Sequence, residues 1–161
     1  MLIAARGQVC SPFGVSYSDV LHKSDEVAGH AKALGAKFVP VAALPDCQPF
    51  TEAITLRTAE EFNRIGKLYR EKHGLIYCCH NHGCEFVPHG SGTLFDLLMD
   101  KTHPEDVSHE LVILWAFRPG ADPPALLSKY GNCFKLLHLK DLKKGVKGGL
   151  CGKTPVENDA E

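Results

Sequence analysis

Short apolar segments alternate with segments of helical periodicity along most of this chain of 161 residues. Four of the apolar segments are partly β-branched or bounded by turn residues, which is typical of buried strands. They are Ala36–Ala42, Leu75–Asn81, His109–Trp115 and Cys133–Leu139. Strands that alternate with helices at this spacing form right-handed βαβ units around a parallel sheet. The sequence therefore predicts the α/β class.

Helical periodicity accounts for most of the sequence between these strands. The expected helices span Tyr17–Leu34, Thr58–His73, Gly90–Leu98 and Asp122–Tyr130. Thr58 and Glu61 have the spacing of a capping box, and Gly35 is a typical residue after a helix end. A weaker strand is expected at Gln8–Cys10, before the first helix.

The composition favours a soluble globular protein with neither a nucleic acid nor a membrane as partner. Eighteen basic residues balance 19 acidic ones, giving a net charge of -1, and no basic stripe offers a nucleic-acid surface. No apolar run approaches the roughly 18 residues of a membrane span, and the first residues lack a signal-peptide pattern. The seven cysteines are odd in number and irregularly spaced, which argues against a secreted disulfide framework. We therefore expect a cytoplasmic protein.

Two predicted strands end in stretches that are more polar than burial alone would favour, His80–Phe86 and His138–Asp141. Carboxylate and imidazole groups at neighbouring strand ends suit a divalent metal, which can polarise a substrate carbonyl. Glu110 is less clear, because it lies near the start of its predicted strand. The stretch Cys78–Cys84 offers a thiolate-imidazole zinc site instead. Alternate side chains of a strand point to opposite faces, however, so this stretch cannot surround one ion by itself.

Six motifs resemble, in order and spacing, the sugar phosphate isomerase/epimerase family of xylose isomerase-like TIM barrels. The motifs are Ala33–Val39, Glu61–Gly66, Tyr77–Phe86, Glu110–Trp115, Gly120–Pro123 and Leu137–Asp141. The resemblance implies a (β/α)8 barrel that holds a divalent metal, usually Mn, Mg, Co or Zn. In that family, sugar oxygens bind the metal, and two carboxylates move a proton between adjacent carbons through an enediolate. The implied substrate is a sugar or a sugar phosphate.

The resemblance also implies roles for particular residues. Glu85 matches the family's first metal-binding glutamate, which often doubles as a base, and His138 matches its metal-binding histidine. Val112 stands where the family usually has a metal-binding aspartate, and the family's last glutamate would lie beyond Glu161. The metal site that the resemblance implies is therefore incomplete.

Four residues are candidate substrate contacts. His80 and His82 share one face, Trp115 can stack on a substrate, and Lys140 belongs to a basic cluster that can meet a phosphate. Each also has a structural alternative: core packing for Trp115, hydrogen bonding at a strand end for the histidines, and solvation in a tail for Lys140.

The length corresponds to part of a barrel, since a TIM barrel typically needs about 250 residues. We expect a partial (β/α)8 TIM barrel with about five parallel strands in residues 1–145, followed by a loop-like tail at 146–161. The expected function is that of an impaired metal-dependent sugar isomerase or epimerase. The alternative is a non-catalytic α/β module that forms a homo-oligomer or binds a sugar, because an open sheet leaves edges to be covered.

Overall fold

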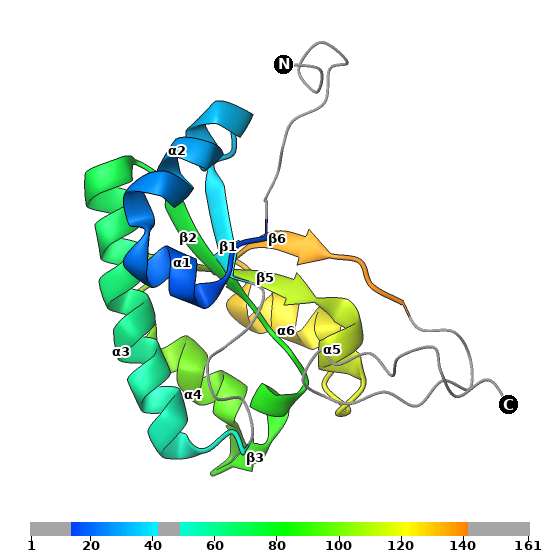
Figure 1. Ribbon diagram of the computed structural model, residues 1–161. Coiled ribbons are helices and arrows are strands. Elements are labelled where there is room, and N and C mark those ends of the chain that lie inside the picture. Colours follow the sequence, from blue (N-terminus) through cyan, green and yellow to red (C-terminus); the bar gives the residue numbers. More distant parts are fainter. Residues whose placement is uncertain (1–13, 42–48, 142–161) are drawn as a thin grey trace, which may run out of the picture.

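The computed structural model describes residues 14–41 and 49–141, which contain a four-stranded parallel sheet (Figure 1). The strands are β1 (Phe38–Val41), β2 (Ile76–His80), β5 (Val107–Val112) and β6 (Phe134–His138), and their spatial order is β1-β2-β5-β6. A two-stranded antiparallel sheet pairs β3 (Pro88–His89) with β4 (Gly92–Thr93). The α/β class is confirmed. The expected strand Gln8–Cys10 and the expected tail at 146–161 lie outside the described residues.

Helices precede and connect the strands of the parallel sheet. They are α1 (Tyr17–His22), α2 (Ser24–Leu34), α3 (Glu52–Leu68), α4 (Leu94–Lys101), α5 (Ile113–Phe117) and α6 (Pro123–Tyr130). A π-helical turn, η2 (Tyr69–His73), continues α3, and a 3-10 turn, η3 (Cys84–Phe86), follows β2. Helix α3 runs along one side of the molecule with α4 packed against it (Figure 1). None of the helices in the described ranges is both long and apolar enough to cross a membrane.

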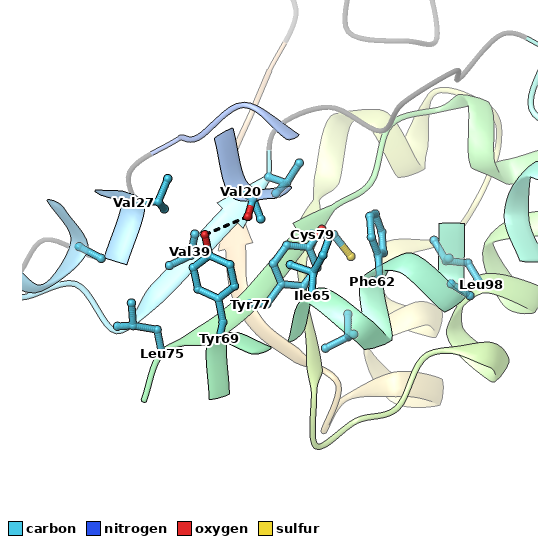
Figure 2. Packing of buried hydrophobic residues seen from close by; sticks show 14 of the residues in the cluster. Val20, Val27, Val39, Phe62, Ile65, Tyr69, Leu75, Tyr77, Cys79 and Leu98 are labelled. Carbon is cyan, nitrogen blue, oxygen red and sulfur yellow. Dashed lines mark hydrogen bonds between the residues drawn. The ribbon is translucent and has the colours of Figure 1, made fainter. Parts of the chain in front are cut away.

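The main core lies between β2 and α3. Tyr77 and Cys79, alternate residues of β2, belong to the same buried cluster as Phe62 and Ile65 of α3 (Figure 2). The rings of Phe62 and Tyr77 meet edge to face, with centroids 5.4 Å apart. Because alternate residues of a strand point to opposite faces, His80 lies on the sheet face that points away from α3.

Three predicted helices differ from the observed ones. The expected helix Gly90–Leu98 starts only at Leu94, because Gly92–Thr93 pairs in β4, and α4 continues to Lys101. The expected helix Tyr17–Leu34 is divided at Lys23, whose backbone (φ -129°, ψ 41°) leaves the helical region. Helix α3 begins before the expected start, because Thr51 caps it by accepting a hydrogen bond from the amide of Ile54 at 3.3 Å. Thr58 is buried inside this helix. The prediction that Thr58 caps the helix is therefore wrong, since the same residue spacing also fits a helix interior.

Asp96 connects α4 to α6 through a set of hydrogen bonds. Its carboxylate accepts from the amide and the hydroxyl of Thr93, from Lys129 Nζ at 2.8 Å and from the Tyr130 hydroxyl at 2.6 Å. Partial burial raises the pKa of this carboxyl, but the hydrogen bonds from Lys129, Tyr130 and Thr93 outweigh burial and leave the pKa well below its ordinary value. Ionised Asp96 therefore stabilises the fold above the unfolded pKa of about 3.9, and this contribution is lost as the pH falls below that value.

Replacing Asp96 with alanine is expected to lower the free energy of unfolding by about 2 kcal/mol at pH 7, because the helix cap and the links to α6 are lost together. Asp100→Ala is the matched control, since within the described part of the chain Asp100 pairs only with exposed Lys101, and the change should alter stability by no more than about 0.5 kcal/mol. Urea unfolding at pH 7 and pH 3 measures both variants. The Asp96→Ala deficit should shrink at pH 3, and an equal deficit in the two variants at pH 7 would contradict this role.

Candidate functional site

The carboxyl ends of β2, β5 and β6 meet at one edge of the parallel sheet, and the arrowheads of β5 and β6 point the same way (Figure 1). His80 of β2 is in register with Glu110 of β5, and Val112, two residues further along β5, is in register with His138 of β6. Residues in register on parallel strands share a face, as do residues two apart on one strand. His80, Glu110 and His138 therefore share the face that points away from α3.

These three side chains form one cluster of donor atoms. One ring nitrogen of each histidine and one carboxylate oxygen of Glu110 all lie within 4.8 Å of one another. His80 Nδ1 is 3.2 Å from Glu110 Oε2, and the rings of His80 and His138 have centroids 6.1 Å apart. The side chains of His80 and Glu110 are only 13% and 10% exposed, whereas His138 is exposed. The His80–Glu110–His138 cluster thus has two shielded members and one open to solvent.

The sequence gives a misleading position for Glu110. A strand is present at the predicted place, but the predicted bounds His109–Trp115 are wrong, because β5 spans Val107–Val112 and the next five residues form α5. Glu110 consequently lies toward the carboxyl end of its strand, and Trp115 lies on a helix. The apolar run from Leu111 to Trp115 concealed this boundary. An alternating pattern marks the observed strand, with one face formed by Val107, His109 and Leu111 and the other by Ser108, Glu110 and Val112.

Glu85 lies on η3, just after β2, and is fully buried. Both of its carboxylate oxygens accept hydrogen bonds from the backbone amide of His82, at 3.0 and 2.9 Å, and the Cys84 thiol donates at 3.5 Å. Burial raises the pKa of this carboxyl, although these hydrogen bonds oppose the shift. The Glu85 carboxylate thus stabilises the loop that follows β2. Glu85 is not part of the His80–Glu110–His138 cluster. Its expected roles as metal ligand and base stay predictions.

The structure brings the four candidate substrate residues together in one row. The ring centroids of His80 and His82 are 5.0 Å apart, and those of His82 and Trp115 are 6.2 Å apart. Lys140 Nζ lies 4.6 Å from the centroid of the Trp115 ring, and the Arg118 guanidinium carbon lies 5.9 Å from the same ring. His80 belongs to both the row and the cluster, so the two form one continuous site.

Burial limits how the side chains of this row can contact a ligand. Trp115 is 2% exposed and His82 is 6% exposed, so both side chains also pack as core residues. Burial lowers the pKa of His82 to about 4, with the positive charges of His80 and Lys140 adding to the effect. His82 Nδ1 is buried and has no hydrogen-bond partner within the described ranges. A neutral imidazole whose nitrogen has no protein partner can donate to or accept from a ligand hydroxyl that reaches it.

Asn81 fixes the relative position of the two strand ends. Its amide nitrogen donates to the carbonyl of Val112 at 3.2 Å, and its amide oxygen accepts from the Val112 amide at 2.8 Å. This pair of hydrogen bonds holds the end of β2 against the end of β5, next to His80 and Glu110. The sequence offers only a weak signal for this role, an asparagine directly after a strand.

A parallel α/β sheet with a polar site at its strand ends is the arrangement of the TIM-barrel class, and solved structures of that class are similar to this chain. A sugar phosphate isomerase/epimerase from Parabacteroides distasonis matches 98% of this chain and 58% of that chain, with a TM-score of 0.67 and 26% sequence identity. A second one from the same organism matches 84% of this chain and 52% of that chain, with a TM-score of 0.65 and 23% identity.

A third similar structure is a probable 3-DHS dehydratase involved in petrobactin synthesis from Bacillus anthracis, with a TM-score of 0.69 and 14% identity over 87% of this chain and 53% of that chain. No protein-family model and no curated protein sequence matches. The chain therefore has the fold of the sugar phosphate isomerase/epimerase structures and spans a little over half of their length. The resemblance carried by the six motifs and the expected partial TIM barrel are both confirmed.

Proposed function

We propose that this chain binds a sugar or sugar phosphate at the carboxyl ends of β2, β5 and β6, as part of an isomerase or epimerase. The observation that carries the proposal is the row of His80, His82, Trp115 and Lys140 beside Glu110. Ligands of such barrels bind at this end of the sheet. The similarity to two sugar phosphate isomerase/epimerase structures supports the choice of substrate class.

Each member of the row has a chemical task in this proposal. His80 and His82 hydrogen-bond the hydroxyl groups of the sugar, and Lys140 attracts a phosphate group by charge. Trp115 is too buried to stack on a sugar ring, so its indole face instead holds the Lys140 ammonium in place through a cation–π contact at 4.6 Å.

The reaction moves a proton to and from the carbon beside the sugar carbonyl, which requires a base. Glu85 is the proposed base, because its raised pKa suits a carboxyl group that exchanges protons closer to neutral pH. Glu85 and His80 both line a small cavity of about 10 Å³, roughly the volume that one water molecule needs. Phe95 and Leu98 of α4 also line this cavity, which therefore lies on the helix side of the sheet.

A divalent metal, when bound in this class of enzyme, stabilises the negative charge that develops on the substrate oxygen. The residues that the family resemblance assigns to this metal do not make up a group of three or more donor atoms among the described residues. The Val112 side chain has no donor atom, and both oxygens of Glu85 accept a hydrogen bond from the amide of His82. Only His138 of the assigned set belongs to a cluster of donor atoms.

Solvent deuterium exchange tests the proposed reaction. The chain is incubated in deuterium oxide with aldoses, ketoses and their phosphates, with Mn²⁺ or Co²⁺ present, and proton NMR follows the hydrogen beside the carbonyl. We expect one substrate to lose this signal. Binding without exchange would favour the non-catalytic sugar-binding module instead, and the absence of both binding and exchange would contradict the proposal.

Lys140→Met is expected to weaken the binding of a phosphorylated sugar about tenfold, or roughly 1.4 kcal/mol, because it removes the charge that meets the phosphate. The affinity for the same sugar without its phosphate should stay unchanged. Lys67→Met on the exposed surface of α3 is the matched control and should alter neither affinity. Calorimetric titration measures all three proteins. An equal loss of affinity for both forms of the sugar would show that Lys140 does not recognise the phosphate.

A further inference from the structure

The His80–Glu110–His138 cluster contains a carboxylate that the family resemblance assigns to no role. Glu110 lies two residues before Val112 on the same face of β5, and Val112 stands at the position of the family's metal-binding aspartate. A carboxylate is thus present on the correct strand and the correct face, one pleat nearer the strand start. His80, in register with Glu110, lies at the same level on β2.

The three donor atoms are close to the spacing that a single ion needs. A first-row divalent ion binds nitrogen and oxygen ligands at about 2.1 Å, so two of its ligands lie no more than about 4.2 Å apart. His80 Nδ1 and Glu110 Oε2, at 3.2 Å, already satisfy this limit. The whole set lies within 4.8 Å, and a small side-chain rotation of exposed His138 would close the remaining difference.

The charge and burial of Glu110 also favour a cation. The residue is 8% exposed, and among the described residues its carboxylate has a single hydrogen-bond partner, His80 Nδ1. A shielded carboxylate can accept several more bonds than this and is costly to leave uncompensated. A divalent ion would bind both the carboxylate and the imidazole nitrogen that now faces it.

We infer that His80, Glu110 and His138 form a divalent metal site of the two-histidine, one-carboxylate type, in which Glu110 replaces the carboxylate missing at Val112. Three protein ligands from three neighbouring strands leave coordination positions open on the side facing solvent, where ligand oxygens can bind. Two nitrogen donors and one oxygen donor favour Zn²⁺, Co²⁺, Fe²⁺ or Mn²⁺ over the all-oxygen sites of Mg²⁺. The site depends on the geometry of the cluster and not on the proposed sugar reaction.

A second group of donor atoms supplies a matched control. His103, Glu105 and Asp106 also bring their ligand atoms within 4.8 Å of one another, in the loop before β5. There the Asp106 carboxylate already pairs with Arg70 Nε at 2.8 Å, and His103 and Glu105 are exposed. Because a guanidinium already neutralises its buried carboxylate, we expect this second group to bind metal poorly.

Titration of the full chain with Co²⁺ and Zn²⁺, followed by calorimetry and by the visible spectrum of bound Co²⁺, tests the site without any sugar. Glu110→Gln keeps a hydrogen-bond partner for His80, so it should fold normally, and it should weaken metal binding tenfold or more. His80→Gln should do the same. His103→Gln should bind metal as the unaltered chain does, and the Co²⁺ spectrum should lack thiolate charge-transfer bands. Melting of each variant without metal verifies that it is folded.

Three results would overturn the inference. Unchanged metal affinity in folded Glu110→Gln would show that this carboxylate does not bind the metal. Loss of binding in His103→Gln would show that the metal binds in the loop before β5. Loss of binding in folded Glu85→Gln, with Glu110→Gln unaffected, would show that the family's usual glutamate holds the metal. The proposed sugar function would fail separately, through the absence of sugar binding in a chain that still binds metal.

Discussion

Phe62→Ala is expected to lower the free energy of unfolding by about 3–5 kcal/mol. Phe62 is fully buried at the centre of the contact between α3 and β2, where its ring meets Tyr77 edge to face and lies 6.3 Å from the ring of Tyr17. Its removal loses the burial of a whole aromatic ring and leaves a cavity that the two tyrosines cannot fill. Urea unfolding should show the loss directly, and the melting temperature should fall by roughly 10 °C or more.

Phe117→Ala is the matched control for this prediction. Phe117 lies at the end of α5 and is 68% exposed, so the same chemical change should alter the free energy of unfolding by no more than about 0.5 kcal/mol. If the two variants lost similar stability, the packing of α3 on β2 shown in Figure 2 would be incorrect.

Gly66→Ala is the second change with a large expected effect. A Cβ atom at Gly66 would lie 2.2 Å from the carbonyl oxygen of Asp106 and 2.7 Å from its carbonyl carbon. Both are backbone atoms of the residue just before β5, so the added methyl group can be accommodated only if α3 moves away from the sheet. We expect a loss of about 3 kcal/mol in the free energy of unfolding.

Gly29→Ala makes the same substitution where space is available. Gly29 lies in α2, and nothing would lie within 4 Å of its added Cβ. Because alanine favours a helix more than glycine does, this variant should gain about 0.5–1 kcal/mol. The two variants should therefore change the free energy of unfolding in opposite directions, and chemical unfolding measures both changes. A Gly66→Ala protein as stable as Gly29→Ala would mean that α3 does not approach the start of β5 so closely.

Local patterns in the sequence predict much of this fold. Strand β2 lies within the predicted segment Leu75–Asn81. The two-residue period of a strand places Tyr77 and Cys79 on one face of the sheet and His80 on the other. Helix α6 begins at Pro123, as the proline after Asp122 indicates. These features depend on short-range geometry, which the residue types determine directly.

The candidate site is harder to predict, because it depends on register between strands far apart in the sequence. His80 and His138 are recognisable as polar residues at strand ends, but Glu110 joins them only because β5 starts at Val107 and pairs His80 with Glu110. A shift of the strand by one residue would turn Glu110 toward the helices. The sequence also does not indicate that the helix is interrupted at Lys23, since the apolar spacing continues across this residue.

Fluorescence of Trp115 is the most direct measurement of the central proposal, because the sequence contains a single tryptophan and Trp115 contacts both His82 and Lys140. The chain is titrated with sugar phosphates at a fixed concentration of Co²⁺ or Zn²⁺, and Glu110→Gln is titrated in parallel. We predict a saturable change in emission with one of the sugar phosphates, at an affinity that Glu110→Gln reduces. No saturable change with any sugar or sugar phosphate, in a chain that is folded and loaded with metal, would contradict the proposal that this site binds such a ligand.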